Sequence, residues 1–361
     1  MAVLLEYKCP SCGGALSFDS DVQKLKCPYC DTGLEVEALQ ELDEALKEAQ
    51  PEDTTWNQEP SAQWSGEEQN ELHTYVCDSC GGEITTEATT AATHCPYCGN
   101  PVVVAERLSG QIKPDLVVPF KVDKNAAMAA YANHLKGKRL LPKEFTAENR
   151  IEKLQGVYVP FWLFDTKVDA NVRYRGTRVQ TWSDSKYDYV RTSYYSLLRG
   201  GSMGFANVPV DGSVKVDNDL MESIEPYDMS QAVDFQTAYL AGFLADKFDV
   251  DAEECKTRAN ERIRSSVENF FTSTTYDFAT VIPEDTNLRY SDSNVRYALL
   301  PVWMLTTQYK NKTYTFAMNG QTGKLVGNLP IHWGTFFKYL FGIGLGSGFL
   351  ISLLLWLFCM L

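Results

Sequence analysis

Residues 75–84 read YVCDSCGGEI and are followed at residues 95–98 by CPYC. The same pattern occurs 68 positions earlier, where residues 7–16 read YKCPSCGGAL and residues 27–30 read CPYC. In both copies 14 residues separate the two Cys-x-x-Cys pairs. This repeat indicates that one small module is duplicated within the chain.

The spacing of the cysteines predicts two metal sites. A Cys-x-x-Cys turn directs two thiolates at one point, and a second turn completes the tetrahedron that Zn²⁺ prefers. We expect two structural zinc ions per chain, with a redox-active dithiol or iron as the alternatives. The predicted ligands are Cys9, Cys12, Cys27 and Cys30 in the first site and Cys77, Cys80, Cys95 and Cys98 in the second. Because every ligand is a cysteine, neither site has the open position of a catalytic zinc.

Charge is concentrated at the front of the chain. Residues 1–75 hold sixteen Asp and Glu against four Lys and Arg, whereas the other 286 residues hold thirty-one acids and twenty-nine bases. This distribution argues against a protein that binds nucleic acid through a basic surface. Four Cys-x-x-Cys pairs need reduced thiols, and the start of the chain has no signal-peptide pattern, so we expect a cytosolic location for these modules.

The two cysteine modules match zinc ribbons in their spacing and are called ribbons below. Between them, residues 34–49 place leucines at helical spacing among acids and predict a short amphipathic helix. This helix either packs on its own ribbon or binds a partner. Residues 50–72 have the composition of a flexible acidic linker. Trp56 and Trp64 are unusual in such a linker, and they are interpreted either as anchors for a partner or as side chains that dock on the chain's own body.

The rest of the chain predicts an α+β body. Asp123 is a plausible N-cap for a helix that ends at Gly137. Further helices are expected at residues 231–247 and 251–271. Strands are expected at residues 156–164, 171–182, 187–198, 204–210, 274–290 and 295–327, with antiparallel neighbours and turns at Asn319-Gly320 and Thr322-Gly323.

A second, weaker repeat links Val159–Phe164 (VPFWLF) with Leu300–Leu305 (LPVWML), which indicates two related halves in the body. The sequence contains no P-loop, no G-x-S-x-G, no H-E-x-x-H and no glycine-rich dinucleotide motif. We therefore do not expect an enzyme.

The last part of the chain predicts a membrane anchor. Lys338 is the last charged side chain, and the 23 residues from Tyr339 to Leu361 contain none. A helix of that length spans about 34 Å, which is enough for the ~30 Å hydrocarbon core. We expect a single-pass tail anchor in the cell membrane with the body in the cytoplasm. Gly342, Gly344, Gly346 and Gly348 either allow a flexible entry into the membrane or form a self-association face.

These features define the expected organisation. It comprises a zinc ribbon at residues 1–33, an acidic helix and linker at 34–72, a second ribbon at 73–107, an α+β body at 108–330 and a transmembrane tail at 335–361. The preferred function is a non-enzymatic membrane adaptor or scaffold. The alternative is a membrane-tethered, nucleic-acid-binding or regulatory zinc-ribbon protein, which the acidic charge disfavours.

Several stretches are distinctive in addition to the tandem ribbons: GVYVPFWLFD (156–165), VPVDGS (208–213), MESIEPYD (221–228), AYLAGFLADKFDV (238–250) and residues 297–330. Together they resemble one bacterial family, the membrane-anchored TFIIB-type zinc-ribbon proteins, whose members are often labelled primosome-helicase-like. The resemblance implies membrane organisation or envelope-stress work beside SPFH-domain (virion-core-like), PspA-like and TPM-domain proteins. It carries over only the eight zinc cysteines.

Overall fold

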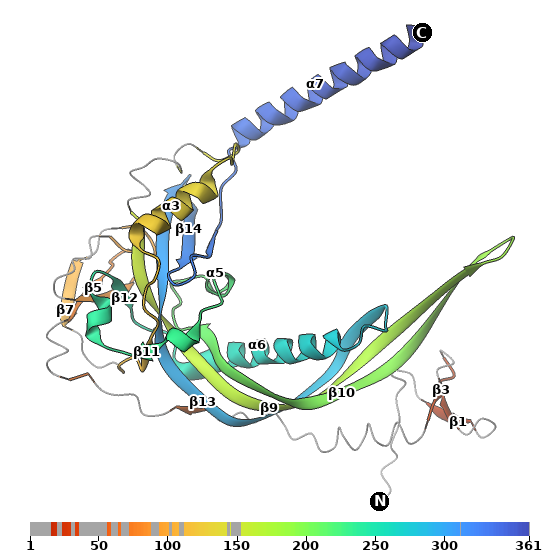
Figure 1. Cartoon of the computed structure of the whole chain (residues 1–361), viewed down its shortest axis with the longest axis horizontal. Coiled ribbons are helices and arrows are strands. Elements are labelled where there is room, and N and C mark those ends of the chain that lie inside the picture. The colour runs from red at the N-terminus through yellow and green to blue at the C-terminus, as the bar shows by residue number, and fades with distance from the viewer. Residues whose placement is uncertain are drawn as a thin grey trace, which may run out of the picture. The chain divides into compact units, whose positions relative to one another are not determined.

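The computed structural model forms two compact units (Figure 1). Unit 1 comprises Met1–Glu59, Leu163–Pro209 and Glu253–Val295, and unit 2 comprises Pro60–Trp162, Val210–Ala252 and Arg296–Leu361. The described residues are 16–19, 24–29, 33–35, 56–58, 64–65, 72–87, 94–100, 103–107, 112–142, 145, 153–310 and 312–360. Within them the fold is a mixture of α and β dominated by sheet, as the sequence predicts, and it includes four α-helices.

The described strands form two sheets. The smaller sheet has the order β1 (Ser17–Asp19), β2 (Lys24–Lys26), β3 (Gly33–Leu34) and is antiparallel. The larger sheet follows the order β11-β8-β13-β9-β12-β6-β5-β7, and β4, β10, β14 and β15 pair with members of that path. Its shorter strands are β4 (Asn57–Gln58), β5 (Leu72–Val76), β6 (Glu83–Glu87), β7 (Val103–Arg107), β8 (Leu116–Val117), β11 (Val233–Asp234), β12 (Leu244–Asp246), β14 (Lys312–Asn319) and β15 (Leu325–Gly327).

Three strands are much longer than the sequence indicates. They are β9 (Gln155–Ser183), β10 (Asp188–Asp211) and β13 (Thr280–Tyr309), with 29, 24 and 30 residues. The strands predicted at 156–164 and 171–182 merge into β9, and those at 187–198 and 204–210 merge into β10, because the residues between them stay extended. β13 joins most of the strand predicted at 274–290 to the first part of the stretch predicted at 295–327, whose remainder forms β14 and β15. In unit 1, α6 (Ala252–Ser273) runs beside these strands and buries Ile263 and Val267 against Val172 and Tyr174. This helix confirms the prediction for residues 251–271.

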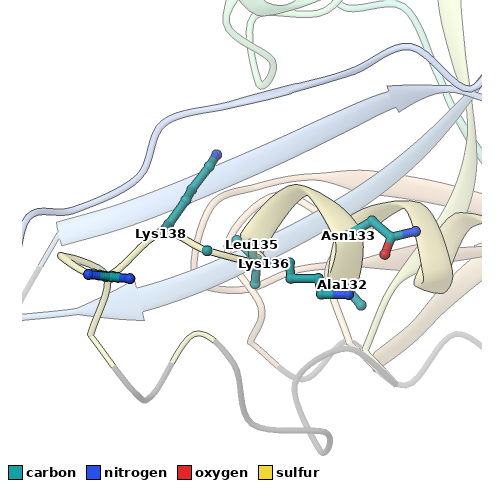
Figure 2. A pocket seen from close by; sticks show the side chains of 7 residues that line it. Ala132, Asn133, Leu135, Lys136 and Lys138 are labelled. Atoms are coloured by element: carbon teal, nitrogen blue, oxygen red, sulfur yellow. The ribbon is translucent and has the colours of Figure 1, made fainter.

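In unit 2, α3 (Lys124–Leu135) begins where predicted, with the Asp123 carboxylate accepting a hydrogen bond from the Ala126 amide at 2.7 Å. The helix ends before Gly137, whose φ of +80° suits glycine. Lys136 and Lys138 lie on the turn that follows (Figure 2). The remaining helices are α5 (Asn218–Ser223), the 3₁₀ turns η2 (Met229–Gln231) and η3 (Thr237–Leu240), and α7 (Trp333–Met360).

The helix predicted at residues 231–247 is wrong. This stretch contains the two short 3₁₀ turns and the strands β11 and β12. β12 pairs in parallel with β9 and in antiparallel fashion with β6, while Gly242 adopts a φ of +81° that breaks any helix. Pairing with distant strands therefore overrides the local helical pattern. Of the helix predicted at residues 34–49, Leu34 ends β3, and residues 36–49 lie outside the described residues.

Both linker tryptophans dock on the chain's own body. Trp56 packs edge-on against Phe164 in unit 1, with ring centroids 4.9 Å apart, and the adjacent β4 pairs with β13. Trp64 packs edge-on against Phe235 in unit 2 at 5.6 Å. Of the two interpretations of these residues, the structure shows the intramolecular one.

The two Pro-x-Trp segments of the weaker repeat are held by matching bonds in unit 2. The indole Nε1 of Trp162 in β9 donates to the Val250 carbonyl at 2.9 Å. The indole Nε1 of Trp303 in β13 donates to the Val122 carbonyl, also at 2.9 Å. Each buried indole thereby satisfies its single donor.

The glycines that follow β10 and β14 form a second pair of matching hydrogen bonds. The Gly212 amide donates to the Pro160 carbonyl at 2.9 Å, and the Gly320 amide donates to the Pro301 carbonyl at 2.8 Å. Each glycine carbonyl in turn accepts two backbone amides, from residues 249 and 250 for Gly212 and from residues 121 and 122 for Gly320. The two segments of unit 2 thus have the same local hydrogen bonding.

The residues that complete these bonds belong to two further similar stretches, FKVD (120–123) and FDVD (248–251), which the sequence analysis missed. Each directly precedes a helix, α3 or α6. The Phe120 ring lies 5.2 Å from Trp303, and the Phe248 ring lies 5.2 Å from Trp162. The strands just before these stretches, β8 and β12, pair in parallel with β13 and β9. One half of the body therefore comprises FKVD, α3 and β9, and the other half comprises FDVD, α6 and β13. Each stretch contacts the long strand of the opposite half.

This arrangement predicts that any side chain at position 320 destabilises the protein. A Cβ at this position would lie 2.6 Å from ring atoms of Phe120 and 2.8 Å from Pro301 Cβ. We expect Gly320→Ala to lower the free energy of unfolding by about 1–3 kcal/mol through overpacking. The matched control is Gly204→Ala, where a Cβ meets nothing within 4 Å. Urea unfolding of the detergent-purified chain measures both, and equal midpoints would contradict the assignment.

Candidate metal centre and membrane anchor

The second ribbon is a hairpin that carries one cysteine pair, followed by a loop that carries the other. β5 and β6 pair from Leu72↔Glu87 to Val76↔Glu83, and Cys77 directly follows β5. The Gly81 amide donates to the Cys77 carbonyl at 2.8 Å, and Gly81 has a φ of +71°. The second pair repeats this turn, since the Gly99 amide donates to the Cys95 carbonyl at 2.8 Å with a φ of +75°. Glycine is needed four residues after the first cysteine because the left-handed backbone turns both thiols inward.

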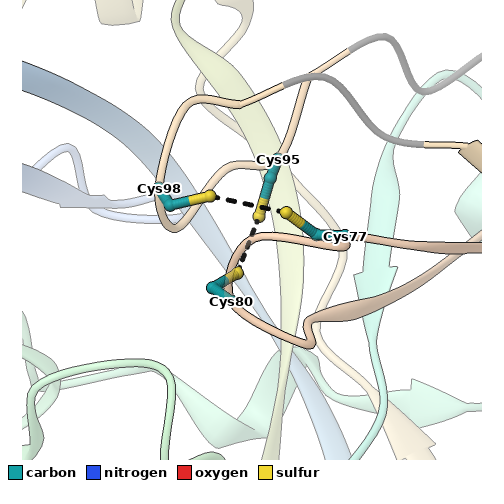
Figure 3. Close-up of side chains that lie close together, drawn as sticks. All are labelled: Cys77, Cys80, Cys95 and Cys98. Carbon is teal, nitrogen blue, oxygen red and sulfur yellow. Dashed lines mark hydrogen bonds between the residues drawn. The ribbon is translucent and has the colours of Figure 1, made fainter.

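The four thiols converge on one point (Figure 3). The Sγ atoms of Cys77, Cys80, Cys95 and Cys98 all lie within 4.8 Å of one another. Cys77 Sγ lies 3.5 Å from Cys98 Sγ, and Cys80 Sγ lies 3.6 Å from Cys95 Sγ. Zn–S bonds of ~2.3 Å in a tetrahedron place the sulfurs about 3.8 Å apart, so this donor set fits a zinc ion.

The environment of the thiols differs from one cysteine to the next. Burial raises the pKa of the Cys95 and Cys80 thiols. Burial also acts on Cys77, but the backbone amides of Cys80 and Ser79 outweigh it and lower the pKa of that thiol. A metal ion binds the thiolate form, so binding at neutral pH must release protons from the thiols with raised pKa values.

The first ribbon is described only in part. β2 is followed by Cys27, whose side chain is fully buried. Cys9, Cys12 and Cys30 lie outside the described residues. The geometry therefore shows a cluster that could hold a metal ion for the second set of cysteines, and both zinc ions remain predictions.

The second ribbon is part of the body's sheet. β6 pairs with β12 through Thr85↔Ala245 and Ile84↔Asp246. The ribbon residues Tyr75, Cys77, Ile84, Cys95 and Tyr97 share one core cluster with strand residues of the body. On the other side, the Thr306 hydroxyl donates to the Pro96 carbonyl at 2.6 Å. The ordering of the metal site and that of unit 2 are thus linked.

A buried charge cluster, which the sequence analysis did not identify, lies at this junction. The Asp246 carboxylate in β12 is buried and accepts hydrogen bonds from the Ser213 hydroxyl at 2.8 Å and the Lys247 amide at 3.0 Å. Lys215 lies 3.4 Å from Asp246 and 3.0 Å from Asp249. Burial raises the pKa of Asp246. Burial would lower the pKa of Lys215, but the two carboxylates outweigh it and raise that pKa. A charged, hydrogen-bonded cluster of this kind fixes the geometry of the junction.

The C-terminal helix α7 is the second functional feature. Trp333–Ser352 is long and apolar enough to cross a membrane, and none of it is buried in the protein. Gly342, Gly344, Gly346 and Gly348 lie on this helix with nothing within 4 Å of the position a Cβ would take. The helix is compatible with membrane anchoring.

One curated relative resembles the chain over nearly its whole length. The chain is 35% identical over 345 residues to YdjG, an uncharacterized protein of Bacillus subtilis (strain 168), and the match covers 96% of each protein. The chain belongs to the YdjG family. A match of this length cannot be confined to the ribbons. No family model and no solved structure matches the chain.

The metal site generates a prediction about stoichiometry. We expect two zinc ions per purified chain, and we expect Cys77→Ser with Cys80→Ser to remove one of them and to destabilise unit 2, because the ribbon shares its core. The control is Cys255→Ala, which removes a buried cysteine of α6 and should keep both ions. Elemental analysis measures the content. Fewer than about 1.5 zinc ions per chain, or the presence of iron, would contradict the two-site assignment.

The exposed helix generates a prediction about the membrane. A chain without residues 335–361 should stay folded and leave the membrane fraction, because no part of Trp333–Ser352 is buried against the body. The full-length chain should remain with the membrane pellet after a high-salt wash. A truncated chain that still sediments with membranes in high salt would show that α7 is not the main anchor.

Proposed function

We propose that this protein is a non-enzymatic, membrane-anchored zinc-ribbon adaptor. The observation that carries the proposal is the cluster of Cys77, Cys80, Cys95 and Cys98, which offers a metal four thiolates and leaves no position for a substrate. Because β6 belongs to the body's sheet, the metal would stabilise the body rather than perform chemistry. The likeness to YdjG over 345 residues supports a role that needs the whole chain.

The proposed topology is a single pass in the cell membrane with the body in the cytoplasm. The thiol cluster requires a reducing compartment. Lys338 lies near the start of α7 and favours the cytoplasmic side under the positive-inside tendency. We propose that Gly342, Gly344, Gly346 and Gly348 let a second copy approach closely within the bilayer.

The outer part of the β9–β10 hairpin, residues 178–198, offers a surface for protein binding and is here named the distal hairpin. Nearly all of its side chains are exposed. The large apolar side chains exposed on it are Val179, Trp182, Tyr187, Tyr189, Val190, Tyr194, Tyr195 and Leu198. An exposed group of this kind marks an interaction site, since aromatic residues supply most of the binding energy at protein interfaces.

The tip of the distal hairpin is pre-organised. The Asp184 carboxylate accepts hydrogen bonds from the Lys186 and Tyr187 amides at 2.7 and 2.8 Å, and from the Tyr189 hydroxyl at 2.9 Å. The Trp182 and Tyr189 rings stack with centroids 5.4 Å apart. A rigid tip loses little conformational freedom on binding, which favours recognition of a partner.

The proposed partners are an SPFH-domain or PspA-like protein and, in addition, a TPM-domain protein. The support for them is the family resemblance of VPVDGS, EPYD and the tandem ribbons. A scaffold in a membrane-stress or membrane-organisation complex suits an anchored protein, because confinement to a plane raises the effective concentration of weak partners. Nucleic acid is the weaker alternative, and salt-sensitive DNA binding by the ribbons would support it.

The distal hairpin gives the test of this function. Trp182→Ser with Tyr189→Ser should reduce the recovery of co-purified membrane proteins at least tenfold, because removal of two interface aromatics costs more than about 1.4 kcal/mol. Pull-down from native membranes with mass spectrometry measures the recovery. The matched control is Tyr276→Ser, an exposed tyrosine outside the hairpin.

The control should recover the same partners as the unaltered chain. Equal recovery from the hairpin variant, or isolation of monomers alone after crosslinking in native membranes, would contradict the adaptor function.

A further inference from the structure

A basic cavity lies at the C-terminal end of α3. It has a volume of about 480 Å³ and is lined by Ala132, Asn133, Leu135, Lys136, Gly137, Lys138 and Arg139 (Figure 2). Residues 136–139 read KGKR and are here named the basic loop. Lys136, Lys138 and Arg139 are all exposed. Three positive charges thus lie within four residues at the wall of one cavity.

The charges of the basic loop are not neutralised by the part of the chain that the structure describes. None of the ion pairs among those residues includes Lys136, Lys138 or Arg139. Lys138 Nζ donates to His134 Nε2 at 2.7 Å. Burial, followed by the Lys138 charge, lowers the pKa of His134, and burial lowers the pKa of Lys138. An anion in the cavity would relieve this excess of positive charge.

The residue after the basic loop is bonded to the residue before the C-terminal helix α7. The His332 amide donates to the Leu140 carbonyl at 2.7 Å, and α7 begins at Trp333. His332 also holds that turn, because its carbonyl accepts the Thr335 and Phe336 amides at 3.0 Å. The segment after the basic loop and the segment before α7 share one core, in which Leu141 and Leu329 pack against the buried face of α3.

This connection fixes the depth of the basic loop if α7 crosses the bilayer. The Cα of Lys138 lies at most about 8 Å from that of Leu140, since one residue advances at most ~3.8 Å. The headgroup layer of each leaflet is roughly 5–8 Å thick. Trp333 is exposed at the same end, as is typical of a tryptophan at a membrane interface. If the membrane-spanning part of α7 begins at Trp333, the lysine side chains can reach the layer that holds lipid phosphates.

We propose that the basic loop and its cavity bind the phosphate of an anionic phospholipid headgroup. The inference rests on the proposed membrane anchoring and adds the lipid class that the anchor selects. Lys136 and Lys138 supply point charges, and Arg139 supplies a planar fork for two phosphate oxygens. Basic clusters beside a membrane helix attract anionic lipids by about 1 kcal/mol for each charge, or about fivefold in affinity.

A second explanation for the basic residues makes a different prediction. Cations near the C-terminus of a helix stabilise it by interacting with the helix dipole. If that were their whole role, neutralising them would lower the thermal stability of the chain without changing which lipids it retains.

The experiment compares two double variants of the full chain. Lys136→Gln with Lys138→Gln removes two charges from the basic loop, and Lys121→Gln with Lys124→Gln removes two exposed charges at the other end of α3. Each protein is purified in detergent and mixed with equal amounts of phosphatidylglycerol and phosphatidylcholine. The lipids retained after gel filtration are then quantified.

We expect the unaltered chain and the Lys121/Lys124 variant to retain phosphatidylglycerol preferentially. The Lys136/Lys138 variant should lose that preference by up to about 30-fold, from the fivefold effect of each charge. Equal preference in both variants would overturn the proposal. If millimolar inorganic phosphate stabilises the chain against heat as strongly as phosphatidylglycerol does, the site takes a soluble anion, and the lipid assignment is wrong.

Failure of the anchor itself is measured separately. Insertion of the unaltered chain into vesicles of phosphatidylcholine alone tests whether α7 spans a bilayer without any contribution from the basic loop. An inserted chain that shows no lipid preference contradicts only the headgroup site, whereas a chain that does not insert contradicts the membrane anchoring on which both proposals rest.

Discussion

Parallel pairing between the two halves of the body is the constraint on which the rest of the structure depends. β8 pairs with β13, and β12 pairs with β9, so each short strand lies against the long strand of the other half. The indole hydrogen bonds of Trp162 and Trp303 stabilise these pairings, because they join β9 to the segment after β12 and β13 to the segment after β8. Because the partners are far apart in sequence, neither half can complete its own sheet. The sheet of unit 2 therefore depends on contacts between segments far apart in the sequence.

The metal centre depends on the same pairing. β12 lies between β9 and β6, so the strand that joins the two halves also joins the second ribbon to the body. The buried Asp246 at this junction is satisfied by Ser213 and Lys215, two residues that follow β10. A cysteine module that could fold independently is here continuous with the sheet. A change of metal content would consequently affect the surface of unit 2 and not the ribbon alone.

Much of the site could be predicted because its signals are local. The interval of 14 residues between the Cys-x-x-Cys pairs, with glycine after each pair of the second set, is enough to predict the four thiols that meet in the structure. The apolar composition after Lys338 likewise predicts a helix able to span a membrane. The run KGKR at residues 136–139 was also visible in the sequence, but its relevance depends on the bond between Leu140 and His332, which joins segments almost 200 residues apart.

The sequence by itself determined the α+β class, the second set of metal ligands, the N-cap and end of α3, the span of α6 and the apolar tail, since each depends on neighbours within a few turns. Tertiary structure alone decided that residues 231–247 form strands and short turns, that separately predicted strands join in β9, β10 and β13, and that Trp56 and Trp64 dock on the body. The physical reason is that a strand gains its hydrogen bonds from a partner elsewhere in the chain, whereas a helix, a cap or a Cys-x-x-Cys turn satisfies its own.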